Sequence, residues 1–252
     1  DGWLNKVKIN DFKKINITLI EKLDKRAKSY LDDFEIYESQ RLFPVGVIPY
    51  AVIIKNNKKF KIDKKRSWDF LLSKELQGKI ILPKSPRIVT SIAQKISTNN
   101  ALAKLIEQVD IYDDKNTLDW FLNTDSSVAI VPLNRCLEFL KIDPRISIVF
   151  PNDGVPLSWQ FLLVKSQLNQ DSLIDWINLL KKTDSVNKLR SIGWYLPFKE
   201  EFIQDSYKDV RSFNSKYENP SKECWDNSWS YALLRNKEKL DLENLWNKLL
   251  TP

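Results

Sequence analysis

Hydrophobic and polar residues follow two patterns along the first part of the chain, one typical of helices and one typical of buried strands. Apolar residues recur at helical spacing over residues 15–33, which predicts an amphipathic helix packed on a core. Residues 42–57 form a β-branched run that contains Pro and Gly early and stops at a polar turn, which predicts a long buried strand. We expect this strand to link two parts of the molecule.

Helices and strands are expected to alternate after this strand. Ser67 is a good N-cap for a short helix, and Gly78 ends that helix before a strand over residues 79–82. Ser85 and Pro86 begin the next helix, with Pro in the favoured first position. Because this helix starts near the carboxyl end of a strand, we predict a βα crossover in an α/β sheet. The N-terminus of the helix is a candidate binding spot.

The same alternation continues to about residue 200. Helices are predicted at residues 102–109, 116–123, 135–142, 171–182 and 184–191, and strands at residues 128–131, 146–150 and 157–164. Beyond residue 200 the strand pattern is lost, and helices are predicted near residues 201–209 and 240–250. The predicted fold class is α/β, with mixed or parallel sheets and a helical tail.

Composition argues against an enzyme. The chain has no His and five Gly, and it contains neither a GxGxxG nor a GxxxxGK[ST] string. Without His, the usual general base, the Ser-His and Cys-His pairs and most zinc sites are absent. Asp113 and Asp114 are adjacent acids, but neighbours in sequence do not form a catalytic pair without convergent geometry. We expect a binding protein with no catalytic residues, no metal site and no cofactor.

The net charge of +7 would suit an anionic partner if the charge were concentrated in one place. Lysines are scattered beside acids, and the densest patch, residues 55–66, is one short hairpin-like stretch. This pattern favours a solvated surface, and a basic nucleic-acid-binding protein is kept as an alternative. Cys136 and Cys224 carry no spacing signal, so two ordinary buried or free cysteines are favoured over a single disulfide.

Targeting and membrane signals are absent from this sequence. No run of about 18 apolar residues occurs, so we expect no membrane span. The chain opens at Asp1 rather than Met and shows no signal peptide, so we expect a processed form or a fragment.

Four segments, in order, resemble the spermidine/putrescine-binding family of type 2 periplasmic solute-binding proteins. The most specific is the third, in which SWDFL, LQGKI and SPR recur at family spacing around a predicted helix, strand and helix. The other three are DGWL at residues 1–4, the strand at 43–55, and VFPNDG with IGWYLP at 149–154 and 192–197. The resemblance covers nearly the whole chain, but the family's first strand and helix would precede Asp1.

The resemblance implies a two-lobed type 2 periplasmic-binding-protein fold with an incomplete first lobe. Lobe one would comprise residues 1–55 and 158–196, and lobe two residues 56–157 and 197–252. A small-molecule solute would bind in the cleft between the lobes, which would close about hinge strands ending near Lys55 and beginning near Leu157.

The function implied by the resemblance is that of an extracytoplasmic receptor, a monomer that delivers its solute to the membrane subunits of an ABC importer. No nucleic-acid partner is expected on this reading. A non-transport binding or scaffold protein on the same fold is a second alternative.

The resemblance also implies ligand-binding positions, most of which are altered here. A polyamine site needs carboxylates to pair ammonium groups and aromatic rings to cover the methylene chain. In this chain Ser85 occupies an acid position before Arg87, Ser158 and Gln160 occupy the strand that turns Trp and Asp inward, and Trp194 occupies a Tyr position. The lost carboxylates predict a ligand less cationic than spermidine, either neutral or anionic.

Three of the aromatic and charged residues in these segments also have a structural interpretation. Trp194 is equally well explained as a packing residue between lobes. Trp159 is expected in the core, because strand side chains alternate and Ser158 and Gln160 would face the cleft. Arg87 is more often a surface or strand-end partner, although beside a helix N-terminus it could clamp a carboxylate or phosphate.

Overall fold

The computed structural model of the protein describes residues 7–55, 67–143, 145–167, 171–180, 182–203 and 219–250. The strands are β1 (Phe43–Lys55), β2 (Ile80–Leu82), β3 (Val109–Tyr112), β4 (Val128–Pro132), β5 (Ile146–Val149) and β6 (Leu157–Leu162). The α-helices are α1 (Ile17–Ile20), α2 (Lys25–Asp32), α3 (Ile36–Ser39), α4 (Pro86–Ala93), α5 (Ala101–Gln108), α6 (Thr117–Asn123), α7 (Leu133–Ile142), α8 (Asp171–Leu180), α9 (Thr183–Ser191), α10 (Lys222–Asn227) and α11 (Asn236–Leu250).

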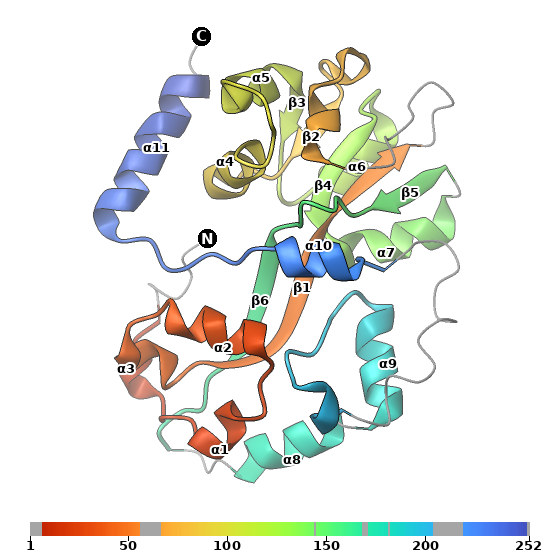
Figure 1. Ribbon diagram of the computed structural model, residues 1–252. Helices are drawn as coiled ribbons and strands as arrows, with labels where there is room; N and C mark the ends of the chain where they lie inside the picture. The colour runs from red at the N-terminus through yellow and green to blue at the C-terminus, as the bar shows by residue number, and fades with distance from the viewer. Residues whose placement is uncertain are drawn as a thin grey trace.

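These elements form two bodies joined by long segments (Figure 1). The large body contains β2 to β5 with helices α4 to α7. The small body contains α1 to α3, α8 and α9. Strand β1 runs from one body into the other, with β6 beside its first half. The chain then returns through α10, and α11 lies alongside the large body.

Strand β1 is the common element of both bodies. Its first half pairs with β6, from Phe43 to Pro49, and its second half pairs with β4 and β5, from Tyr50 to Lys55. The sheet order is β3-β2-β4-β1-β5, and β6 pairs with β1 outside that path. The long strand predicted from its apolar run is therefore confirmed.

The apolar sequence of the central strands explains their position. Ile80, Ile81 and Leu82 of β2 are fully buried, as are Val52 and Ile53 of β1. Each such side chain contributes about 1.5–3 kcal/mol when it leaves water. A strand covered on both faces reads as a continuous apolar run rather than an alternating one, which is the pattern in this sequence.

The direction of the strands determines where the loops gather. β2 pairs parallel with both β3 and β4, whereas β1 is antiparallel to β4. The carboxyl ends of β2, β3 and β4 therefore lie at one edge of the sheet, which faces the small body (Figure 1). The predicted βα alternation and mixed sheet are confirmed.

Two predicted helices differ from the structure. The single helix expected over residues 15–33 is broken into α1 and α2, because Asp24 caps α2 by accepting from the Ala27 N–H and itself donates its N–H to Pro197. The helix expected after Ser67 is instead two 3-10 segments, Trp68–Leu72 and Lys74–Leu76. The Ser67 side chain does not cap the first segment, and its hydroxyl donates to the Asp69 carboxylate at 3.4 Å, while the Trp68 N–H donates to Asp153 at 3.2 Å.

Some predicted features lie outside the described residues. These are the DGWL segment at residues 1–4, residues 56–66 of the basic stretch, and residues 204–209 of a predicted helix. Of that predicted helix, the described part is a 3-10 turn at Glu200–Phe202.

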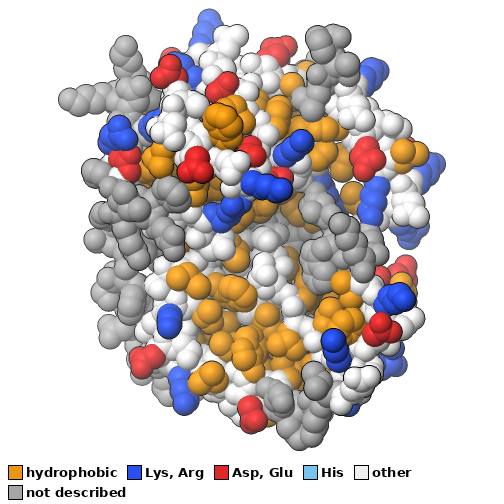
Figure 2. All heavy atoms as spheres, turned by 180° about the vertical axis from the view of Figure 1, so that it is seen from behind, with side chains coloured by type: hydrophobic (Ala, Val, Ile, Leu, Met, Phe, Trp, Pro, Cys, Tyr) orange, Lys and Arg blue, Asp and Glu red, His pale blue; other side chains and the backbone are white. Residues whose placement is uncertain are grey.

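The surface carries both charge signs and an apolar area. On the face opposite to Figure 1, apolar side chains gather over the small body, and Lys and Arg side chains lie beside Asp and Glu around the margin and near the middle of the face (Figure 2). Among the helices of the described residues, none combines the length and the apolar character that a membrane crossing requires.

Candidate functional site

The edge formed by the three parallel strands carries the candidate site. In open α/β sheets, ligands bind beyond the carboxyl ends of the strands. Here the loop after β2 leads to α4, the loop after β3 leads to α6, and β4 runs directly into α7. All three connections are thus short and meet at one place.

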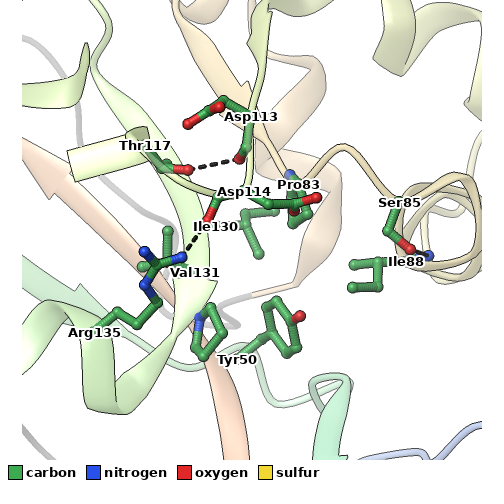
Figure 3. A pocket seen from close by; sticks show the side chains of 11 residues that line it. Tyr50, Pro83, Ser85, Ile88, Asp113, Asp114, Thr117, Ile130, Val131 and Arg135 are labelled. Atoms are coloured by element: carbon green, nitrogen blue, oxygen red, sulfur yellow. Dashed lines mark hydrogen bonds between the residues drawn. The ribbon is translucent and has the colours of Figure 1, made fainter. Parts of the chain in front are cut away.

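A pocket of about 200 Å³ lies at this edge (Figure 3). Each of the three connections contributes side chains, and β1 adds one more at the point where it enters the large body. The lining residues are Tyr50, Pro83, Ser85, Ile88, Asp113, Asp114, Thr117, Ile130, Val131, Pro132 and Arg135. The pocket therefore combines apolar walls with a small set of convergent polar groups, as ligand sites do.

Two carboxylates define the acidic side of the pocket. Asp113 accepts the Asn116 N–H at 2.5 Å, and its carbonyl accepts from the Thr117 hydroxyl at 2.6 Å. Asp114 accepts the Lys84 N–H at 3.0 Å through one carboxylate oxygen. Hydrogen bonds from backbone N–H groups therefore hold both carboxylates in place.

Arg135 and Tyr50 face the same space (Figure 3). The Arg135 guanidinium donates to the carbonyl oxygens of Asp114 and Lys115, the latter at 3.0 Å, so it braces the loop that carries the acids. Burial raises the pKa of Tyr50 above its usual range, and Asp114 and Tyr231 add to the rise. The Tyr50 hydroxyl therefore stays protonated at neutral pH and can donate a hydrogen bond.

Ser85 reaches the pocket from the helix that the sequence predicted. Its hydroxyl caps α4 by accepting the Ile88 N–H at 3.4 Å, and Pro86 occupies the first turn. Ile88 lines the pocket from the same turn.

Ser158, Gln160 and Trp194 lie on one face of the β1–β6 pair. Gln160 is opposite Gly46 and Ser158 is opposite Ile48, and paired residues share a face. The Trp194 indole lies against the same face, since a Cβ on Gly46 would be 1.8 Å from its Nε1 atom. By strand alternation Tyr50 points to that face as well, so the face leads toward the pocket.

Trp159 has the core position that alternation predicted. It is 7% exposed, its ring stacks on Tyr30 with centroids 4.9 Å apart, and its Nε1 donates to the Ser230 hydroxyl at 2.7 Å. Trp194 also makes a structural contact, because its Nε1 donates to the Val45 carbonyl at 3.2 Å.

Arg87 faces a different part of the chain. Residues 228–235, here called the strap, connect α10 to α11 and pass between the two bodies (Figure 1). The Arg87 guanidinium donates to the Ala232 carbonyl and lies 4.8 Å from the centre of the Tyr231 ring. Arg87 is not among the residues that line the pocket.

Tyr231 is the centre of the strap's contacts. Its hydroxyl is 2.5 Å from the Ser91 hydroxyl of α4 and accepts the Trp229 Nε1–H at 3.1 Å. Its carbonyl accepts the Tyr30 hydroxyl of α2 at 2.8 Å. The strap is therefore bonded to the large body through α4 and to the small body through α2.

Sequence analysis did not propose five of the polar pocket residues: Tyr50, Asp113, Asp114, Thr117 and Arg135. The adjacent acids Asp113 and Asp114 were noted, but they were weighed only as a catalytic pair. The useful signal was their position between a short apolar segment and a helix. If residues 109–112 are read as a strand parallel to β2, these acids fall beside Ser85.

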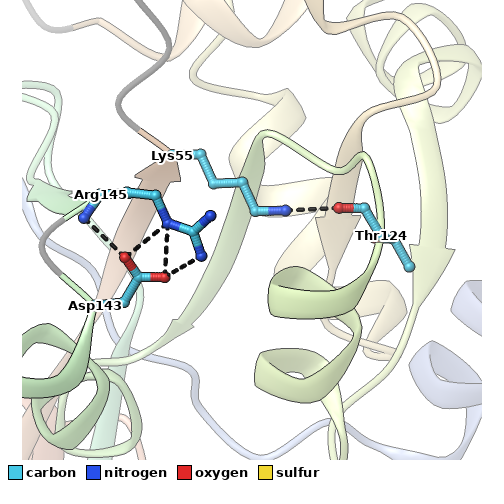
Figure 4. Close-up of polar contacts among 4 residues, drawn as sticks. All are labelled: Lys55, Thr124, Asp143 and Arg145. Carbon is cyan, nitrogen blue, oxygen red and sulfur yellow. Dashed lines mark hydrogen bonds and ion pairs between the residues drawn. The ribbon is translucent and has the colours of Figure 1, made fainter.

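Of the basic stretch at residues 55–66, the structure describes Lys55, which is the last residue of β1. Its Nζ donates to the carbonyl of Thr124, the C-cap of α6, at 2.6 Å and lies 5.1 Å from the Phe121 ring centre (Figure 4). Burial lowers the pKa of Lys55, and Arg145 lowers it further. Lys55 thus caps a helix of the large body.

The cysteines and the acids give no sign of a metal centre in the described residues. Cys136 and Cys224 are free and buried, as favoured from the sequence, and burial raises their pKa values to about 12 and about 11. Across the residues described, no group of three or more Cys, Asp or Glu side chains is arranged to hold a metal ion.

Residues 3–206 match the family model described as bacterial extracellular solute-binding protein. A search of curated proteins finds no match.

Solved structures give the same picture of the fold. A spermidine/putrescine ABC transporter substrate-binding protein, PotD, from Streptococcus pneumoniae is 16% identical, with a TM-score of 0.67 over 98% of this chain and 80% of that chain. A putative extracellular solute-binding protein from Bordetella parapertussis is 11% identical, with a TM-score of 0.70 over 99% of this chain and 79% of that chain.

A third structure shows how widely ligands vary on this fold. The ferric binding protein from Campylobacter jejuni is 12% identical, with a TM-score of 0.57 over 95% of this chain and 77% of that chain. These likenesses confirm the predicted two-lobed solute-binding fold, and each of the three solved chains is longer than the part matched.

Proposed function

Because the chain belongs to the bacterial extracellular solute-binding protein family, we propose that it is the extracytoplasmic receptor of an ABC importer and binds a small solute between its two bodies. The observation that carries this proposal is the pocket at the carboxyl ends of β2, β3 and β4, on the side that faces the small body. The membrane subunits of the importer would be its protein partner, and the receptor would act as a monomer.

The lobes would correspond to residues 1–55 with 158–196 and to residues 56–157 with 197–252. Strands β1 and β6 would serve as hinge strands, because β1 changes partners from β6 to β4 between Pro49 and Tyr50. Closure about such a hinge would bring Ser158, Gln160 and Trp194 toward Ser85.

The charges of the candidate site favour a solute with one cationic group. Asp113 and Asp114 can pair an ammonium group on the large-body side, while Ser158 and Gln160 offer neutral hydrogen bonds on the small-body side. A buried ammonium group without a paired carboxylate is costly. A polyamine needs carboxylates along its length, so we propose a monoamine with a neutral polar remainder. Such a solute is less cationic than spermidine, but the pocket acids give it one positive charge, in place of the neutral or anionic solute expected from the sequence.

Only the family resemblance assigns Arg87 to ligand binding. Its guanidinium already bonds the strap, so the proposed site relies on Ser85, Ser158, Gln160 and Trp194 together with the pocket acids. Trp194 would supply an apolar surface for the solute, because its indole nitrogen is occupied by Val45.

A thermal-shift screen tests the receptor function. The panel contains monoamines, amino alcohols, amino acids, spermidine, putrescine, sugars, carboxylates and phosphate esters. A bound solute at about 100 times its dissociation constant adds roughly 2.7 kcal/mol to stability, which is a clear rise in melting temperature. No rise with any compound at millimolar concentration would count against a solute receptor.

The variant Asp114→Asn tests the site. An amide oxygen can still accept the Lys84 N–H, so the loop should keep its shape, but the charge is lost. A charged hydrogen bond is worth about 1.5–3 kcal/mol, so calorimetry should show at least about tenfold weaker binding of a monoamine hit. Asp119→Asn, on the exposed part of α6, is the matched control and should leave binding unchanged. Tight binding of spermidine would overturn the monoamine class and leave the receptor function standing.

A further inference from the structure

Beside the pocket, a glycine of the small body lies against the large body. Gly193 follows α9 in the small body and has a φ of +77°, in the left-handed region that favours glycine. Its N–H donates to Arg190 at 2.9 Å and the Trp194 N–H donates to Leu189 at 3.0 Å, which is the Schellman pattern at a helix end. The local backbone thus holds Gly193 in a defined position.

The neighbours of Gly193 belong to the large body. A Cβ added at Gly193 would lie 2.9 Å from the backbone nitrogen of Asn134 and 2.9 Å from the Cγ of Leu133, the first residues of α7. A Cβ essentially never comes this close to another heavy atom. Since one of the atoms is helix backbone, it cannot rotate away as a flexible side chain would.

The contact adjoins the pocket on one side and the β1–β6 face on the other. On the large-body side, Pro132 and Arg135 flank Leu133 and Asn134, and both line the pocket. On the small-body side, the next residue is Trp194, whose indole lies on Gly46 in the face that also carries Gln160.

We propose that Gly193 is the closing contact between the two bodies, a positioning residue whose missing side chain lets the loop after α9 seat against α7. Any side chain at this position holds the bodies apart and widens the space between the pocket and the β1–β6 face. This inference builds on the proposed function, but the contact can be measured without any solute.

The experiment measures the distance between the bodies directly. Nitroxide labels are placed on Lys104→Cys of α5 and Lys188→Cys of α9, which are exposed positions in the large and small body. The native cysteines are buried, and their raised pKa values leave them unreactive toward the label. Pulsed electron double resonance then gives the distance distribution of the solute-free protein.

Gly193→Ala is compared with Gly78→Ala as the matched control. Gly78 has a φ of +64°, but a Cβ there would meet nothing within 4 Å, so its Ala variant carries the backbone strain without a steric neighbour. We expect Gly193→Ala to give a longer and broader distance distribution, and Gly78→Ala to overlay the parent. Identical distributions for Gly193→Ala and the parent would overturn the proposal.

A second pair of variants covers the case in which Gly193→Ala does not fold. Asn tolerates the left-handed region better than Ala, so Gly193→Asn and Gly78→Asn separate the steric contact from strain. The same lengthened distance is expected for Gly193→Asn alone, and a parent-like distance would overturn the proposal.

The affinity for a solute gives an independent measurement of how far the two bodies close. If the closed fraction falls to about one tenth, the apparent dissociation constant of a solute found in the screen rises about tenfold. Failure of the screen would refute the receptor function and leave the distance measurement valid. Unchanged distances together with normal solute binding would refute only the Gly193 contact.

Discussion

The strap and the Gly193 contact join the same two bodies in opposite ways. The strap uses hydroxyl, indole and guanidinium groups of residues such as Arg87, Trp159 and Tyr231, which bond across both bodies. The contact at Gly193 is steric, against the Asn134 backbone and the Leu133 side chain, and depends on the absence of a side chain at residue 193. Substitutions can weaken the strap one hydrogen bond at a time, whereas the steric contact at Gly193 either forms or does not form.

The difference matters for a protein that has to open and close. Each hydrogen bond of the strap contributes about 0.5–1.5 kcal/mol, so its strength is a sum of small terms. The steric contact at Gly193 is not such a sum, because packed interiors resist even small added volumes. We expect the loss of single strap bonds to change stability gradually, and substitutions at Gly193 to change the distance between the bodies.

The largest effect is expected where the strap begins. Gly154 has a φ of +87°, and an added Cβ would be 2.1 Å from the Asn227 carbonyl oxygen, just before the strap. Gly154→Ala combines backbone strain with a collision that only backbone movement can relieve, so it should cost about 3 kcal/mol or more. Urea unfolding followed by circular dichroism measures this loss, with Gly78→Ala as the control for strain. A loss no larger than that of the control would contradict the account of this turn.

Arg87→Ala should have the next largest effect. It removes a charged donor to Ala232 and the stacking on Tyr231, which together should cost about 2 kcal/mol in urea unfolding. Arg87→Lys keeps the charge but loses the planar guanidinium, so its cost should be intermediate. If Arg87→Lys and Arg87→Ala were equally destabilised, the geometry of the guanidinium would matter more than its charge; if neither lost stability, the strap would not depend on Arg87.

A smaller loss of stability is expected at Gly46, against which the Trp194 indole packs. Gly46→Ala brings no left-handed strain, but its Cβ would occupy the position of the Trp194 indole. The indole must move and lose its bond to Val45, at a cost of about 1–2 kcal/mol. The Trp194 indole N–H resonance in a nitrogen–proton spectrum should shift strongly, and Val45→Ala, which keeps the carbonyl acceptor, is the matched control. An unmoved resonance would contradict the packing of Trp194 on Gly46.

The smallest effect is expected far from both joints, at the ion pair of Asp143 and Arg145 (Figure 4). Hydrogen bonds from Arg145 lower the pKa of Asp143 from 3.8 to about 2. A lowered pKa in the folded state stabilises the protein above pH 3.8, and this stabilisation is lost as the pH falls toward 2. Carboxyl chemical shifts in an NMR titration should give the lowered pKa, and Arg145→Gln, which keeps the backbone N–H bond to Asp143, should raise this pKa part of the way back to 3.8. Asp143→Asn should leave the distance between the bodies unchanged.

Much of the fold could be predicted because its signals are local. The apolar run of β1, the cap at Ser85 and the proline at the start of α4 each depend on neighbours in sequence. Strand β3 was missed because Val109–Tyr112 is short, half-exposed and directly continuous with α5. The prediction of one long helix over residues 15–33 was wrong. The Asp24 N–H donates a hydrogen bond to the Pro197 carbonyl, and the Asp24 side chain caps a second helix.

The site was harder to predict because its residues meet only through strand pairing. Asp113 and Asp114 reach the pocket because β3 lies parallel to β2, and no local pattern states that pairing. Ser158 and Gln160 were placed by resemblance to a family, and their role as ligand contacts stays a prediction. The strap shows no periodicity, and its partner residues lie up to 201 positions away in sequence.

The long sequence separation between the strap and its partners affects folding during synthesis. Tyr231 bonds Tyr30 and Ser91, which precede it by 201 and 140 positions, so the strap cannot dock until residue 231 has left the ribosome. Contacts between distant residues form late, since the chain must first lose loop entropy. Each body can form its own hydrophobic core during synthesis. We therefore expect the strap amides to be the last to gain protection in pulse-labelled hydrogen exchange. Until then, the newly made protein consists of two bodies held together by β1 and β6.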